Sequence, residues 1–151
     1  MPIKNYTSTV PILDSISRIE YRLAQAGAMH IAKSYAEDKS GKPTGMMFQI
    51  MIENIPMTFK LPAKADNVYK YLRMQRKKLP TKAQDEGLRM QADRTAWKIL
   101  NDWIDIQVSM IELEQAEAIE IFLPYAYDGK ANQTLFEKMK NNNFKLLAEA
   151  T

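Results

Sequence analysis

Apolar residues recur with a helical period near the start of the chain. They lie alternately four and three residues apart, at Ile12, Ile16, Ile19, Leu23 and Ala26. This spacing places them on one stripe of a helix, the side that a globular protein buries. Pro11 suits the first turn of such a helix and Gly27 suits its C-terminal cap. The pattern therefore predicts an amphipathic helix between these two residues.

The period then shortens to two, which is typical of strands. Met46, Phe48, Ile50 and Ile52 alternate with Met47, Gln49, Met51 and Glu53. Turn formers flank this run in EDKSGKPTG and ENIP. We predict a three-stranded antiparallel meander with strands at roughly 29–36, 45–53 and 56–61. Neighbouring side chains of a strand point to opposite faces, so the face with Met46 is expected to be core. The face with Met47 is then an interface or is covered by a second layer of helix.

After Pro62 the helical period returns. Asp66 is a candidate N-cap for a helix over about 67–78, with Val68 and Leu72 facing inward. The turn-rich segment LPTKAQDEG is expected to close this helix before the next one begins.

A long run from Leu88 to about Glu120 contains neither Gly nor Pro. Two apolar stripes follow it, one through Ile99 and Trp103 and the other through Trp97. A helix of this length would extend roughly 48 Å, whereas a compact chain of this size is roughly 40 Å across. We expect this central helix to bend, to end a few residues early or to project into a partner. The two stripes favour a partner and hence a homo-oligomer.

Together these elements predict an α+β fold in a single domain over residues 1–151. An N-terminal helix comes first and the three-stranded antiparallel meander follows. Three further helices complete the chain, and the long Trp-bearing helix among them is central. The segment FLPYAYDGKAN ends the long helix, and Leu135, Phe136 and Met139 mark the short last helix.

Composition excludes several classes of site. The chain of 151 residues has no cysteine, so disulfides and thiolate zinc sites are excluded. No apolar run approaches the roughly 18 residues of a membrane span, and the first residues lack the apolar segment of a signal peptide. These features predict a cytoplasmic protein without a membrane partner. His30 is the only histidine and is expected to be a packed or surface residue of a strand. No cofactor and no enzymatic activity are predicted.

Charge is sorted along the chain. Residues 63–98 carry 10 Lys/Arg and 4 Asp/Glu, whereas residues 99–128 carry no Lys/Arg and 7 Asp/Glu. In the acidic part, Asp102, Asp105 and Glu112 share one face of the predicted long helix. They are expected to form a solvated strip. Two other interpretations stay open: they hold Mg²⁺, which would make a metal-dependent nuclease the third reading, or they pair with basic residues of a neighbouring helix or a second subunit.

The basic part supplies the candidate functional residues. Lys70, Arg73 and Lys77 are spaced at i, i+3 and i+7 and would line one side of the predicted helix. The remaining candidates are Arg76, Lys78, Tyr69 and Tyr71. Cations along a helix can each meet a phosphate, and a nearby ring offers a base a stacking surface. We therefore predict a non-enzymatic nucleic-acid-binding protein, with single-stranded DNA as the leading ligand. The competing interpretation is a solvated face that complements the helix dipole.

Two segments, QADRTAWKILNDWIDIQ and FLPYAYDGKANQTLFE, resemble a family of small proteins of bacterial phages and prophages. The resemblance covers most of the chain and rests on structural motifs: the helix with Trp97 and Trp103, the LPY break and the TLFE helix start. It implies a phage protein in the host cytoplasm that serves DNA replication or recombination, or that disables a host defence. The second role is the alternative function: an interaction protein that inhibits a host defence protein or sequesters a small ligand.

Overall fold

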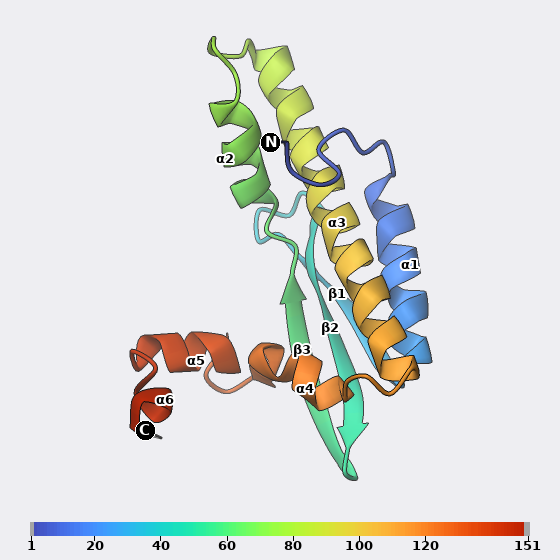
Figure 1. Cartoon of the computed structure of the whole chain (residues 1–151). Coiled ribbons are helices and arrows are strands. Elements are labelled where there is room, and N and C mark those ends of the chain that lie inside the picture. Colours follow the sequence, from blue (N-terminus) through green and yellow to red (C-terminus); the bar gives the residue numbers. More distant parts are fainter. Residues whose placement is uncertain (1, 150–151) are drawn as a thin grey trace.

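The computed structural model describes residues 2–149 and confirms the α+β fold (Figure 1). The first half contains helix α1 (Ile12–Gln25) and strands β1 (His30–Tyr35), β2 (Pro43–Ile52) and β3 (Ile55–Pro62). Two helices follow, α2 (Ala65–Met74) and the long α3 (Lys82–Glu112). The remaining elements are short: α4 (Ala118–Phe122), η1 (Leu123–Tyr125), β4 (Tyr127–Asp128), β5 (Gln133–Thr134), α5 (Leu135–Asn141) and α6 (Lys145–Glu149). Short elements such as the β4–β5 pair were not foreseen, because they contain too few residues to show a period.

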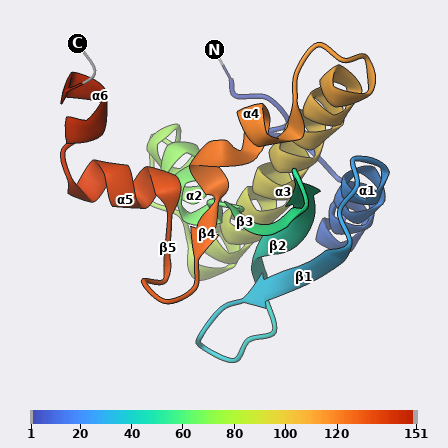
Figure 2. The same ribbon diagram turned by 90° about the horizontal axis from the view of Figure 1, so that it is seen from below.

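The predicted meander is present with the order β1-β2-β3 and antiparallel pairing. Phe48 of β2 pairs with Phe59 of β3, and both side chains are buried together with Met46. Helices α1 and α3 supply the other side of this core (Figure 2). On the opposite face His30 and Met51 are exposed. A second layer of helix therefore does not cover them.

A cluster of aromatic rings packs between the sheet, α3 and α4. Phe48 and Phe59 stack with their ring centroids 5.4 Å apart. Phe122 of α4 meets Phe48 edge-on at 5.1 Å and lies 5.8 Å from Phe59. Trp103 of α3 approaches Phe122 at 6.1 Å. Edge-on and offset contacts of this kind are the favoured arrangements of aromatic rings, so the short α4 is anchored by its single buried residue.

Helix α3 begins six residues earlier than the predicted start at Leu88, because its N-terminus lies inside the segment expected to be a turn. The Thr81 hydroxyl accepts a hydrogen bond from the Gln84 backbone N–H, and the Gln84 side chain accepts one from the Thr81 N–H. This capping box offsets the helix-weakening effect of Gly87 in the second turn. The helix ends early, at Glu112, but because it also begins early its 31 residues make it about as long as the predicted helix.

Helix α2 is shorter than predicted and is capped differently. Its N-cap position is Lys64, which makes no side-chain cap bond, and Asp66 lies in the first turn instead. The helix ends at Met74, so Lys77 lies in the connection to α3 rather than on the helix. The side chains of Val68 and Leu72 are half-buried, in agreement with their predicted inward orientation.

The apolar stripe of α3 through Trp97 is buried, whereas the stripe through Ile99 and Trp103 is only partly covered and becomes exposed toward the end of the helix. Trp97, Ile104 and Val108 are at most 1% exposed. On the other stripe Trp103 is half-buried, while Ile106 is 59% exposed. The sheet and α1 pack on the Trp97 side and bury it fully. The short helix α2 packs on the other side and covers only part of the second stripe.

We expect Trp97→Ala to lower the free energy of unfolding by about 3–5 kcal/mol, because it leaves a cavity in a fully buried site. Trp103→Ala is expected to cost less, since Trp103 already contacts solvent. Met90→Ala, at a 60% exposed position of α3, serves as the control and is expected to stay within about 0.5 kcal/mol of the parent. Urea unfolding followed by circular dichroism measures all three. A larger loss from Trp103→Ala than from Trp97→Ala would contradict the assignment of the buried stripe.

Candidate nucleic-acid interface

The acidic half of α3 is paired with α1 inside the same chain. Arg22 of α1 reaches the Asp105 carboxylate at 2.8 Å from Nε and the Glu112 carboxylate at 3.4 Å from Nη1. Its Nη2 also donates to the Asp105 backbone carbonyl at 3.1 Å and to Ser109 Oγ at 2.9 Å. Of the interpretations left open by the sequence, pairing with a neighbouring helix is the observed one for these two carboxylates.

Asp102 is held by a different set of partners. Lys98, one turn earlier, donates to its carboxylate, Asn5 Nδ2 donates at 2.8 Å, and Lys4 Nζ lies 3.5 Å away. Burial alone would raise the pKa of Asp102, but the hydrogen bonds from Lys98 and Asn5 and the nearby lysine charges outweigh it and lower that pKa. Asp102 and Asp105 thus pair with different residues. Within residues 2–149 no three His, Cys, Asp or Glu residues are grouped as metal ligands would be.

The cations around the turn between α2 and α3 are not paired in this way. We call the cations between residues 70 and 82 the basic tip; they are Lys70, Arg73, Arg76, Lys77, Lys78 and Lys82. All six are exposed, and in the part of the chain that the structure describes none of them forms a salt bridge. Arg76 donates to the Gln84 side chain at 3.1 Å, which directs it toward the start of α3.

The basic tip occupies the turn of a helical hairpin. Helix α2 and the first half of α3 run side by side in opposite directions and extend beyond the sheet (Figure 1). Only Lys70 and Arg73 lie on α2; the next three cations lie in the connection. Met74 and Leu79 are 80% and 81% exposed at the same turn. The tip therefore combines positive charge with accessible apolar side chains.

The two tyrosines proposed for base stacking are half-buried on α2. The Tyr69 hydroxyl donates a short hydrogen bond to the Asp85 carboxylate, and this bond is the largest cause of the lowered pKa of Asp85. The Arg89 guanidinium lies 4.0 Å from the centroid of the Tyr69 ring. Tyr69 thus joins α2 to α3, and a base could stack on it only after Arg89 moves. Tyr71, the other candidate ring, also makes interactions within the protein.

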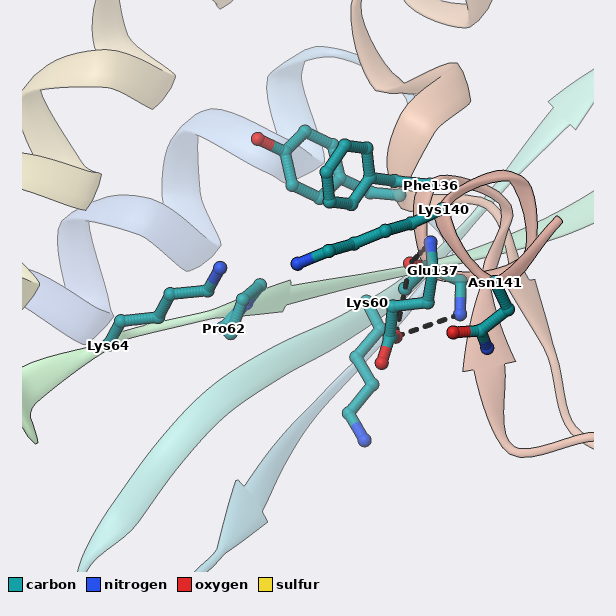
Figure 3. A pocket seen from close by; sticks show the side chains of 9 residues that line it. Lys60, Pro62, Lys64, Phe136, Glu137, Lys140 and Asn141 are labelled. Atoms are coloured by element: carbon teal, nitrogen blue, oxygen red, sulfur yellow. Dashed lines mark hydrogen bonds between the residues drawn. The ribbon is translucent and has the colours of Figure 1, made fainter. Parts of the chain in front are cut away.

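A second cationic site escaped the sequence-based prediction. Lys60 of β3, Lys64 before α2 and Lys140 of α5 line one open hollow of about 530 Å³ (Figure 3). The basic tip was found because its residues are adjacent in sequence. Lys60 and Lys64 are close in sequence, but Lys140 lies more than 70 residues further on, and no local pattern indicates that it shares a hollow with them.

Arg22→Met is expected to lower the free energy of unfolding by about 1–3 kcal/mol, because it removes charge-assisted bonds to Ser109 and to the Asp105 carbonyl. The ion pairs themselves add little, since the Asp105 and Glu112 side chains are 62% and 46% exposed. Arg18→Met, at an exposed position of the same helix, is the matched control. Thermal unfolding at matched salt measures both, and equal losses from the two variants would show that the Arg22 contacts do not join α1 to α3.

Comparisons with models of known protein families, with curated proteins and with solved structures found no match for the chain. In the part of the chain that the structure describes, no helix is both long and apolar enough to cross a membrane. The chain's own surfaces therefore carry the functional argument. Among the described residues, the cations of the basic tip and of the lysine-lined hollow form no salt bridge.

Proposed function

We propose that the protein binds nucleic acid, and single-stranded DNA in particular, through the basic tip. The observation that carries this proposal is the density of exposed cations: six lie within the 13 residues from Lys70 to Lys82, without a salt bridge in the described part of the chain. Each phosphate that meets such a cation releases condensed counterions, and this release is the main source of affinity for a sequence-independent ligand.

Two features favour a single strand over a duplex. The tip is the narrow end of a two-helix hairpin, so it suits a flexible backbone that can bend around it (Figure 1). Met74 and Leu79 are exposed among the cations, and apolar side chains gain from contact with bases that are not covered by pairing. Stacking on Tyr69 or Tyr71 is secondary in this proposal, because both rings already contact the protein.

The resemblance to phage and prophage proteins supplies the proposed setting. We place the binding activity in phage DNA replication or recombination in the host cytoplasm, without catalysis by this chain. Inhibition of a host defence protein is the alternative, and one observation favours it: a tip with exposed Met74 and Leu79 amid cations also suits an acidic protein partner. The salt dependence of binding distinguishes the two functions, because the affinity of phosphate contacts falls steeply with salt concentration and that of an apolar interface does not.

Replacing Lys70, Arg73 and Lys77 together by Ala is expected to weaken binding of a labelled oligonucleotide most at low salt. Each contact with a single strand contributes about −0.7 to the slope of log K against log salt, so the slope should flatten by about 2. Fluorescence anisotropy between about 50 and 300 mM salt measures this.

The matched control replaces Arg18, Lys130 and Lys145 by Ala. These residues are exposed, lie outside the tip and carry the same total charge. The control should keep most of the salt slope of the parent, because the proposal assigns the phosphates to the tip. An equal loss in both variants, or no binding by the parent, would refute the proposed site.

We also propose that the protein self-associates. Met51 and Ile55 are 44% and 62% exposed beside the turn between β2 and β3, and Ile106 and Leu113 are 59% and 68% exposed on the outer stripe of α3. Exposed apolar groups of this kind are typical of interfaces. Light scattering at micromolar concentration is expected to give more than the single-chain mass, and Ile55→Ser with Ile106→Ser should reduce it. A single-chain mass for the parent would contradict this proposal.

A further inference from the structure

A positively charged hollow lies at the opposite end of α2 from the basic tip. It opens between β3 and α5, and Lys60, Lys64 and Lys140 are among the residues that line it. The amine of Lys60 is directed away from the other two (Figure 3). In Figure 3 the side chains of Lys64 and Lys140 point toward one another from opposite walls. In the described part of the chain none of the three lysines forms a salt bridge, although Lys60 Nζ lies 5.2 Å from the centroid of the Tyr127 ring.

One carboxylate shares the lining, and it is already engaged. Glu137 Oε1 accepts hydrogen bonds from the Thr134 backbone N–H at 3.0 Å and from the Thr134 hydroxyl at 3.1 Å. The backbone bond is the largest cause of the lowered pKa of Glu137, and the charges of Lys60 and Lys64 lower it further. The Glu137 carboxylate is therefore charged and is held in place by the capping box of α5. Three lysines against one carboxylate leave an excess of positive charge in the hollow.

An apolar hollow of about 420 Å³ adjoins the first. The two hollows share Pro62, Lys64 and Tyr125 in their linings, so they lie side by side, and we call them together the α2 groove. Its apolar end is lined by Trp103 of α3, whose ring centroid lies 5.8 Å from that of Tyr125. Asn67 lies at the same end, and its side-chain amide has both a donor and an acceptor. Positive charge and aromatic surface thus meet within a single groove.

We propose that the α2 groove binds a nucleoside phosphate, with the phosphate at Lys64 and Lys140 and the base beside Trp103 and Tyr125. Both hollows fall within the volume range of small-molecule sites, roughly 300–1,000 Å³. A phosphate matches the free lysine amines, and a base matches the aromatic end and can bond the Asn67 amide. The nucleotide is either free or the end of a strand. This site does not use the basic tip, so each proposal stands without the other.

The test is calorimetric titration of the whole protein with dAMP and with adenosine. dAMP should bind saturably and adenosine at least about tenfold more weakly, because adenosine lacks the charged group that the lysines meet. Lys64→Gln combined with Lys140→Gln should weaken dAMP binding by at least about tenfold. Lys130→Gln combined with Lys145→Gln makes the same charge change outside both proposed sites and should leave dAMP binding unchanged. Lys77→Gln combined with Lys78→Gln changes the basic tip instead.

A second titration, with a short oligonucleotide carrying a terminal phosphate, separates the two sources. The strand end is the ligand if three results coincide. dAMP does not bind, the Lys64/Lys140 variant binds the oligonucleotide more weakly than the parent does, and removal of the terminal phosphate also weakens binding. If dAMP binds and the variant abolishes it, the free nucleotide is sufficient. The Lys77/Lys78 variant reports on the basic tip in the same experiment, so failure at one site is distinguishable from failure at the other.

Three results would overturn the proposal. One is the absence of dAMP binding together with an unchanged oligonucleotide affinity in the Lys64/Lys140 variant. Another is equal affinity of the parent protein for dAMP and for adenosine. This comparison uses only the parent protein, so it does not depend on whether a variant folds. The third is tighter binding of decyl phosphate than of dAMP, which would assign the groove to an anionic lipid. Trp103 offers an independent readout, because a base stacked near it should quench its fluorescence whereas inorganic phosphate should not.

Discussion

The rotation of α3 about its own axis is the constraint on which the other surfaces depend. Trp97, Ile104 and Val108 must face the sheet and α1, because removing these side chains from water is a large apolar gain for the helix. Successive residues of a helix are about 100° apart, so this burial also decides what every other position faces. Asp105 comes to lie beside Arg22 of α1. Ile106, the next residue, is left exposed.

The same rotation separates the charges of the molecule. The carboxylates near the C-terminal end of α3 are paired with Arg22, Lys98 and Lys4, all within the chain. In the described part of the chain no cation of the basic tip forms a salt bridge, so exposed positive charge is concentrated at the end of the hairpin and, separately, in the α2 groove. These two regions lie at the two ends of α2, whose 10 residues extend about 15 Å.

Much of the fold could be predicted because its signals are local. The stripe from Ile12 to Ala26 predicted α1, and the alternation around Phe48 predicted β2. The start of α3 was missed, since the capping box of Thr81 and Gln84 lies in a segment whose Pro and Gly suggested a turn. The candidate site was predicted in part: the cations after Lys70 are exposed as expected, but α2 ends too early to carry Lys77 on the same helix.

The sequence by itself determined the order of the elements, their faces and the sorting of charge, because each depends on residues only a few positions apart. Only the tertiary structure decided which stripe of α3 is buried. Both stripes are apolar, and the choice depends on where α1 and the sheet pack. Tertiary structure also decided that Asp105 meets Arg22 and that Lys60, Lys64 and Lys140 share one hollow. Such contacts join residues about 80 positions apart, and their geometry is set by how whole helices and strands pack together.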